Sequence, residues 1–93
     1  MGIFGRPNIA NLKSKGDIKG LIKALGYDKD WQVQTAAASA LGEIGDVRAA
    51  DPLIKTLWEN NPLVAPSAAE ALEKIAALHP ESFRNQSSQQ VLD

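Results

Sequence analysis

No cysteine occurs in the sequence of 93 residues, which excludes disulfide bonds, a thiol nucleophile and thiolate ligands for a metal. Long apolar runs are also missing, whereas a transmembrane helix needs about 20 consecutive apolar residues. The first eight residues, MGIFGRPN, contain no apolar core of a secretory signal peptide. We therefore expect a cytoplasmic protein without a membrane partner.

An excess of either charge is absent as well. Ten Lys and Arg residues stand against eleven Asp and Glu residues, a net charge of −1. The basic residues near the N-terminus are Arg6, Lys13, Lys15, Lys19 and Lys23. Nucleic-acid binding needs a broad cationic surface, and this small cluster fits a solvent-exposed helix face better. Nucleic acid is therefore not an expected partner, and binding to it ranks third among the functions we consider.

Catalytic and metal-binding patterns are equally scarce. Nucleophilic catalysis requires a base beside a Ser, Thr or Cys, and His79 is the one histidine of the chain. We expect His79 at a helix C-terminus, where a protonated imidazole complements the helix dipole. The carboxylate pairs Asp28 with Asp30 and Glu70 with Glu73 are explained by turn chemistry and by a solvated helix face. The sequence predicts a protein that is not an enzyme and has no catalytic residue, cofactor or metal.

What the sequence does contain is an internal repeat. The segment GLIKAL at 20–25 recurs 32 positions later as PLIKTL, and six residues between Val33 and Ile44 recur 31 positions later. Within Val33–Ile44 the repeated apolar residues follow helical spacing, so each unit reads as two helices with one apolar stripe apiece. Such units bury their apolar faces only by stacking. We predict an all-α fold, an α-α superhelix (solenoid) of about two and a half helical hairpins with five to six helices.

The run ALGEIGDVRAADPLIKTL, from Ala40 to Leu57, resembles the linker and first helix of short HEAT-like repeats of the phycobiliprotein-lyase type. The resemblance covers roughly residues 9–79 and implies a HEAT-like solenoid, while one such scaffold serves many functions. The family commonly has Arg after the Val that opens the second helix, and this chain has Gln34 and Ala65 there. A ladder of stacked arginine side chains is therefore not supported.

We expect a single domain over residues 1–93. Its parts are the first hairpin elements at 8–25, the repeat helices at 30–58 and 62–79, and a capping helix or tail at 80–93. Side-chain oxygens are predicted to cap the helix starts, and two glycines are predicted to end helices in the left-handed conformation. The predicted caps are Asn8, Asp17, Asp30, Asp46 and Asn61, and the glycines are Gly16 and Gly45.

Two prolines fall inside the predicted helices. Pro52 should bend the helix that runs from Val47 to about Trp58, because proline removes one backbone hydrogen bond. For Pro66 two alternatives stay open: the next helix starts irregularly and becomes regular from Pro66, or it kinks there. We expect that helix to end near Leu78, and a short sixth helix, roughly residues 80–89, to cap the stack.

The resemblance places the second helix of each unit on the concave side of the solenoid. The groove predicted there is shallow and of mixed charge, and it suits a peptide or a protein edge. Its predicted residues are Gln34, Thr35, Ala38, Ser39, Glu43, Ala65, Ser67, Glu70, Glu73 and Lys74.

Three aromatic residues offer a second candidate surface. Tyr27, Trp31 and Trp58 lie in or beside the turns that join the helices of each unit. Stacking brings such turns to one edge at about the helix spacing of 10 Å, and aromatic residues are enriched at protein interfaces. The alternative is that each Trp covers the end of its own hairpin.

Together these patterns predict a non-catalytic protein–protein interaction module, either an adaptor or scaffold or a self-associating homodimer. An accessory subunit of a chromophore lyase or another modifying enzyme is the alternative, and the resemblance alone suggests it. The residues predicted to bind protein are Tyr27, Trp31, Trp58, Thr35, Ser39, Glu70 and Glu73.

Overall fold

The computed structural model describes residues 7–27, 30–59 and 61–81, and within these ranges the chain is helical with no strand. The elements are α1 (Ile9–Lys15), α2 (Ile18–Leu25), α3 (Trp31–Ile44), the 3₁₀ turn η2 (Val47–Ala49), α4 (Ala50–Trp58) and α5 (Ala65–Leu78). The predicted all-α, HEAT-like fold is confirmed. None of the helices in these ranges is long and apolar enough to cross a membrane.

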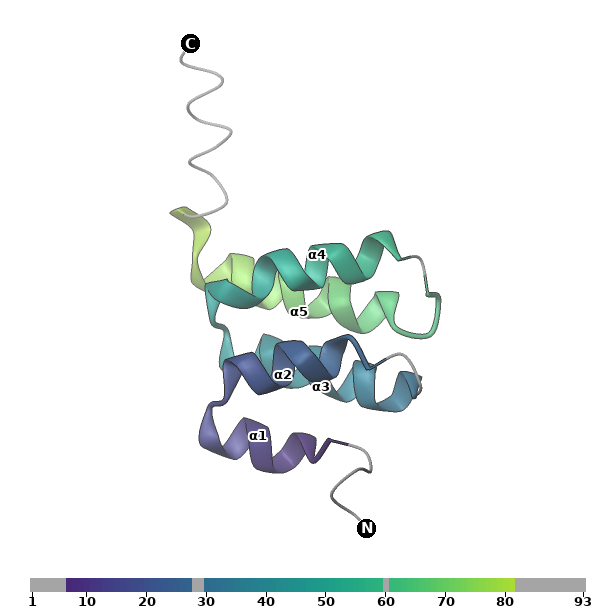
Figure 1. The fold of residues 1–93 in the computed structure, drawn as a ribbon. Coiled ribbons are helices and arrows are strands. Elements are labelled where there is room, and N and C mark those ends of the chain that lie inside the picture. The colour runs from purple at the N-terminus through teal and green to yellow at the C-terminus, as the bar shows by residue number, and fades with distance from the viewer. Residues whose placement is uncertain (1–6, 28–29, 60, 82–93) are drawn as a thin grey trace.

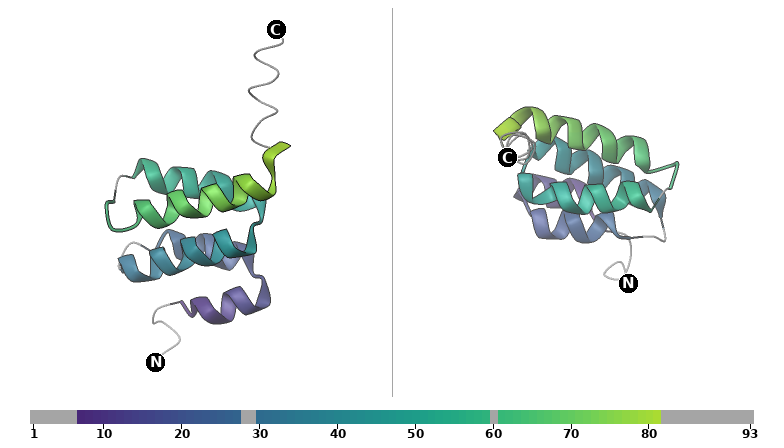
Figure 2. Two further views of the ribbon diagram at one scale, coloured as in Figure 1. Left: turned by 180° about the vertical axis from the view of Figure 1, so that it is seen from behind. Right: turned by 90° about the horizontal axis from the view of Figure 1, so that it is seen from above.

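The helices stack in chain order (Figure 1). Helices α2 and α3 form one hairpin, α4 and α5 form the next, and α1 packs against both helices of the first hairpin. The contact between α3 and α5 is the main one that joins the two hairpins, as the view from behind shows (Figure 2). The repeated sequence blocks thus correspond to equivalent helices in successive units.

The predicted helix caps are formed at four starts. The side chains of Asn8, Asp17, Asp30 and Asp46 each accept a hydrogen bond from a backbone N–H two or three residues further on, at 2.9–3.0 Å. Each such cap stabilises its helix by about 0.5–2 kcal/mol. Local sequence therefore sets these four starts.

Small residues let α3 and α5 approach closely. Their buried faces include Ala37, Ala38, Ala68 and Ala71, each at most 2% exposed. At the crossing itself stands Gly42: a Cβ atom built there would lie 2.8 Å from the Cα atom of Ala71. The two hairpins can therefore pack this closely only with glycine at position 42.

The prolines lie in the first turns of their helices. Pro52 is the third residue of α4, within the first turn, whose N–H groups have no partner inside the helix. The segment from Val47 begins as the 3₁₀ turn η2 and becomes α-helix at Ala50, and a bend at Pro52 stays a prediction. Pro66 is the second residue of α5, so the irregular start is the correct alternative. Asn61, the fifth predicted cap, organises that start. Its side-chain oxygen accepts the N–H group of Leu63 at 3.0 Å, and its backbone carbonyl accepts those of Val64 and Ala65 at 3.0 and 2.8 Å.

The end of α5 differs from the end of α3. Gly45 ends α3 with φ of 77°, whereas the equivalent position in the second unit is Ala76. Without the glycine, α5 continues to Leu78 and ends at His79. Pro80 and Glu81 are helical again, and the rest of the predicted sixth helix lies outside the described residues.

Candidate protein-binding surface

The turns that join the helices of each hairpin lie at the same side of the stack (Figure 1). We call this side the aromatic edge and define it by Trp31, Trp58 and Leu63. Trp31 is the first residue of α3, Trp58 is the last residue of α4, and Leu63 lies in the turn before α5. The two tryptophans that the sequence singled out therefore occur on one edge.

These side chains are exposed to different degrees. Trp58 is 83% exposed, Leu63 53% and Trp31 44%. A tryptophan that covered its own hairpin would lose most of its exposed area, so this role does not describe Trp58. The first unit has Gly26 at the position of Trp58, which indicates that the fold itself requires no large side chain there.

Tyr27 lies in the turn between α2 and α3, but it is less exposed than the two tryptophans. It is partly buried against the core and lines a hollow of about 520 Å³ between α1 and α2, together with Leu12, Lys23 and Ala24. Tyr27 is therefore part of the packing at the N-terminal end of the stack and contributes less to the aromatic edge than the sequence predicts.

Of the predicted groove residues, Gln34 and Ala38 are placed wrongly. Both are buried, at 5% and 0% exposure. The Nε2 group of Gln34 donates a hydrogen bond to the carbonyl oxygen of Leu25 at 3.0 Å, which satisfies the end of α2. The glutamine where the family commonly has arginine thus joins the two helices of its own hairpin.

The other groove residues remain at the surface. Ser39, Glu70 and Glu73 are exposed, and Thr35 is half-buried. The hydroxyl group of Thr35 donates to carbonyl oxygens of its own helix, those of Trp31 at 3.1 Å and Gln32 at 3.0 Å. None of these four residues lines a pocket described here, so a groove along α3 and α5 stays a prediction.

Charges of opposite sign alternate across α1, α3 and α5. Lys13 forms an ion pair with Glu43, and together with the more distant Lys74 it lowers the pKa of the Glu43 carboxyl group. Because Lys13 is paired in this way, one member of the basic N-terminal cluster is already partly neutralised. This arrangement weakens the case for nucleic-acid binding.

A second ion pair lies at the start of η2. The guanidinium group of Arg48 contacts the carboxylate of Asp46 at 2.7 Å. That side-chain hydrogen bond, with the one from the Arg48 backbone N–H, lowers the pKa of Asp46 to about 2. Asp46 therefore carries its negative charge at any pH near neutrality and caps the turn as an anion.

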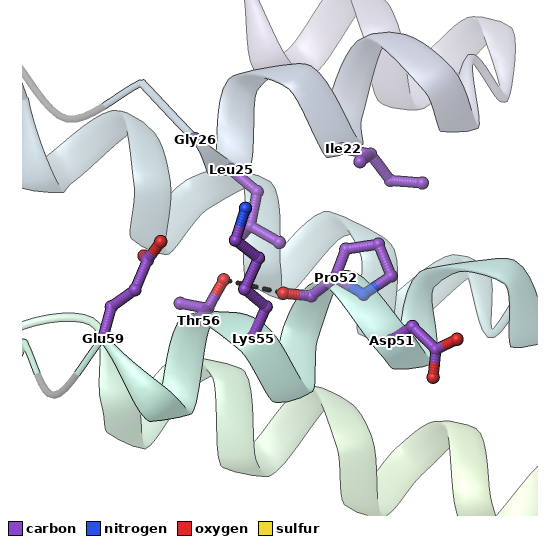
Figure 3. Close-up of a pocket in the computed structure, with 8 residues that line it drawn as sticks. All are labelled: Ile22, Leu25, Gly26, Asp51, Pro52, Lys55, Thr56 and Glu59. Carbon is purple, nitrogen blue, oxygen red and sulfur yellow. Dashed lines mark hydrogen bonds between the residues drawn. The ribbon is translucent and has the colours of Figure 1, made fainter.

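A groove of about 340 Å³ separates α2 from α4 on the outer layer (Figure 3). Ile22 and Leu25 come from α2, Pro52 and Thr56 from α4, and Lys55 extends from α4 toward α2. The Thr56 hydroxyl donates to the Pro52 carbonyl oxygen at 2.9 Å. No sequence pattern indicates this groove, because it depends on how far two non-consecutive helices lie apart.

The described residues include no group of three or more His, Cys, Asp or Glu side chains arranged to hold a metal ion. Glu70 and Glu73, one of the pairs considered above, are exposed on α5.

Comparison with known families agrees with this architecture. The chain matches the family model described as HEAT repeats over residues 8–90. Searches of curated proteins and of solved structures gave no significant match. Since the match covers most of the chain, and since the helical hairpins stack as such repeats do, the chain belongs to the HEAT-repeat family.

Proposed function

We propose that this chain is a non-catalytic protein-binding module, an adaptor or scaffold, whose partner contacts the aromatic edge. The observation that supports this most is the 83% exposure of Trp58, a large apolar side chain at the end of a well-packed helix. Tryptophan is the residue type most enriched among side chains that dominate binding energy at interfaces. HEAT repeats, moreover, generally mediate protein–protein interaction.

The arrangement of the edge favours one partner that contacts both units. Trp58 and Leu63 flank the turn of the second hairpin, and Trp31 follows the turn of the first. Stacked helices lie about 10 Å apart, so a single helix or loop of a partner spans both turns. The same edge also serves self-association if the partner is a second copy.

The experiment is carried out in cells of the source organism. It compares how much cross-linked partner is captured by the wild-type chain and by a double variant that carries both Trp31→Ala and Trp58→Ala. We expect the double variant to lose most of the captured partner while its helical circular dichroism is unchanged. Val47→Ala is the matched control, because Val47 is an exposed apolar residue, 38% accessible, outside the aromatic edge. Equal capture by the wild type and the double variant would refute the proposal.

The alternative, an accessory subunit of a chromophore lyase, rests on the resemblance alone. It is tested separately by mixing the chain with a bilin and following the bilin absorption through size-exclusion chromatography. Retention of the bilin by the chain would favour the alternative over an adaptor.

A further inference from the structure

The two ends of the stack are finished in different ways. At the N-terminal end the single helix α1 exposes polar side chains, among them Asn8, Asn11 and Lys15. A polar outer face of this kind is what a terminal repeat needs for solubility. The C-terminal end is formed by α4 and α5, and its character follows from a comparison of the two hairpins.

Four positions that are buried in the first hairpin are more exposed in the second hairpin. In the first hairpin they are Leu25, Ala38, Leu41 and Gly42, all buried. In the second they are Leu57 and Leu72, half-buried, and Ala69 and Glu73, exposed. We call these second four residues the open end. It has the apolar character of the stacking contact at three positions and a carboxylate at the fourth.

Glu73 replaces the glycine on which the close crossing depends. At Gly42 even a Cβ atom would come within 2.8 Å of the Cα atom of Ala71. A helix cannot approach Glu73 in the same way, and a carboxylate buried without a partner is strongly unfavourable. A helix that stacks on the open end must therefore lie further from α5 than α5 lies from α3. It must also place a basic side chain opposite Glu73.

The sequence that follows does not repeat the apolar pattern of α4. The apolar residues Leu53, Ile54 and Leu57 of α4 would recur 32 positions later, where the chain has Asn85, Gln86 and Gln89. These polar residues lie outside the described residues, and their types alone show that the repeated apolar set is missing. Residues 82–93 therefore do not continue the stack with a repeat of the same apolar pattern.

We propose that the open end is a second protein-binding surface, and that its occupant is a helical hairpin of a partner with Lys or Arg placed opposite Glu73. The surface continues the stacking contact that joins the two hairpins within the chain, and its one charged residue selects a basic partner. A two-fold pair of copies with Glu73 at its axis would place like charges together, which disfavours a second copy as the occupant. This surface is separate from the aromatic edge and does not depend on it.

The first test replaces Glu73 by Gly in the full chain and follows the mass by light scattering coupled to size exclusion over a concentration series. We expect Glu73→Gly to associate at concentrations at which the wild-type mass is unchanged. Glu70→Gly is the matched control: it makes the same substitution on the same helix, but Glu70 corresponds to Ser39 and lies outside the open end. If Glu73→Gly loses helicity, Glu73→Ala retains helix propensity and removes the charge alone. It should still associate more than the wild type, but more weakly than a glycine variant would, because its Cβ atom prevents the closest approach.

The second test uses the Glu73→Lys chain as the probe. This chain presents the same helical hairpin as the wild type, with a lysine in place of the carboxylate. Mixed with the wild type, it should form a heavier species that neither chain forms alone and that high salt dissociates. If the masses of Glu73→Gly equal those of Glu70→Gly at every concentration, the open end is not a stacking surface and the proposal is refuted. The same result would be obtained, and would refute the proposal, if residues after Glu81 cover the open end. Association of Glu73→Gly without any mixed species would refute the selection of a basic partner.

Discussion

The imidazole of His79 donates a hydrogen bond from Nε2 to the backbone carbonyl oxygen of Gly45 at 2.7 Å. The ring nitrogen is the donor because a carbonyl oxygen only accepts. The bond joins residues 34 positions apart and links the end of α5 to the glycine that ends α3. It forms because α5, which lacks a glycine at position 76, runs on to Leu78.

Replacing His79 by Ala should lower the free energy of unfolding by about 1 kcal/mol, the usual net value of one hydrogen bond. Because Gly45 is buried, its carbonyl oxygen would be left without a partner, so the decrease in the free energy of unfolding should lie in the upper part of the usual range. Urea unfolding followed by circular dichroism measures it. Glu81→Ala, an exposed position two residues away, should change stability by less than about 0.5 kcal/mol. Equal stability of the two variants would contradict a structural role for His79.

The crossing of α3 and α5 predicts an unfavourable alanine substitution. Gly42→Ala gains helix propensity, about 1 kcal/mol, yet it forces a methyl group against Ala71, and overpacking of this kind costs about 1–3 kcal/mol. We expect net destabilisation, because the nearest atom is the backbone Cα of Ala71, which cannot move aside as the end of a flexible side chain can. Gly26→Ala is the control, since its nearest neighbour would be 3.6 Å away. A stabilised Gly42→Ala variant would show that the helices do not cross at this residue.

The burial of Gln34 leads us to expect that its substitution lowers the stability of the fold. Gln34→Ala leaves the Leu25 carbonyl oxygen without its side-chain donor, and an unsatisfied buried group costs about 1–3 kcal/mol. Gln32, exposed on the same helix, provides the comparison: Gln32→Ala should unfold at nearly the wild-type urea concentration. Indistinguishable midpoints for the two variants would mean that the hydrogen bond adds nothing to stability.

Because of the ion pair between Asp46 and Arg48, we expect the stability of the fold to depend on pH in the acid range. Because the pKa of Asp46 is lowered from 3.8 to about 2 in the folded chain, the carboxylate contributes stability that is complete above pH 3.8. That contribution is lost as the pH falls toward 2. Arg48→Ala removes the side-chain hydrogen bond, the main cause of the shift, so the Asp46 pKa should rise toward its usual value. An NMR titration of the Asp46 carboxyl carbon measures this, and an unchanged pKa would exclude Arg48 as the cause.

The parts of the fold that local sequence controls were predictable. Asn8, Asp17 and Asp30 accept the expected N–H groups because a cap involves only residues two or three positions away. The repeat itself indicated stacked hairpins, because equivalent apolar stripes need equivalent partners. Gly16 and Gly45 end their helices with positive φ for the same local reason.

Features that depend on distant residues were not predictable in this way. Gln34 was expected in the groove because the resemblance places the second helix of each unit on the concave side, and it is buried because the Leu25 carbonyl lies within reach across the hairpin. The end of α5 near Leu78 was predicted correctly, whereas the hydrogen bond between His79 and the Gly45 carbonyl was not, because it joins residues 34 positions apart. The candidate surface was predicted in part: Trp31 and Trp58 lie on one edge, whereas Tyr27 packs beside α1.

Site-specific photo-crosslinking tests protein binding through the aromatic edge most directly. A photoreactive amino acid replaces Trp58 in one full-length chain and Val47 in another, and both chains are irradiated in cells of the source organism. The account predicts a discrete protein adduct from position 58 and none from position 47. No adduct from position 58, or the same adducts from both positions, would contradict it.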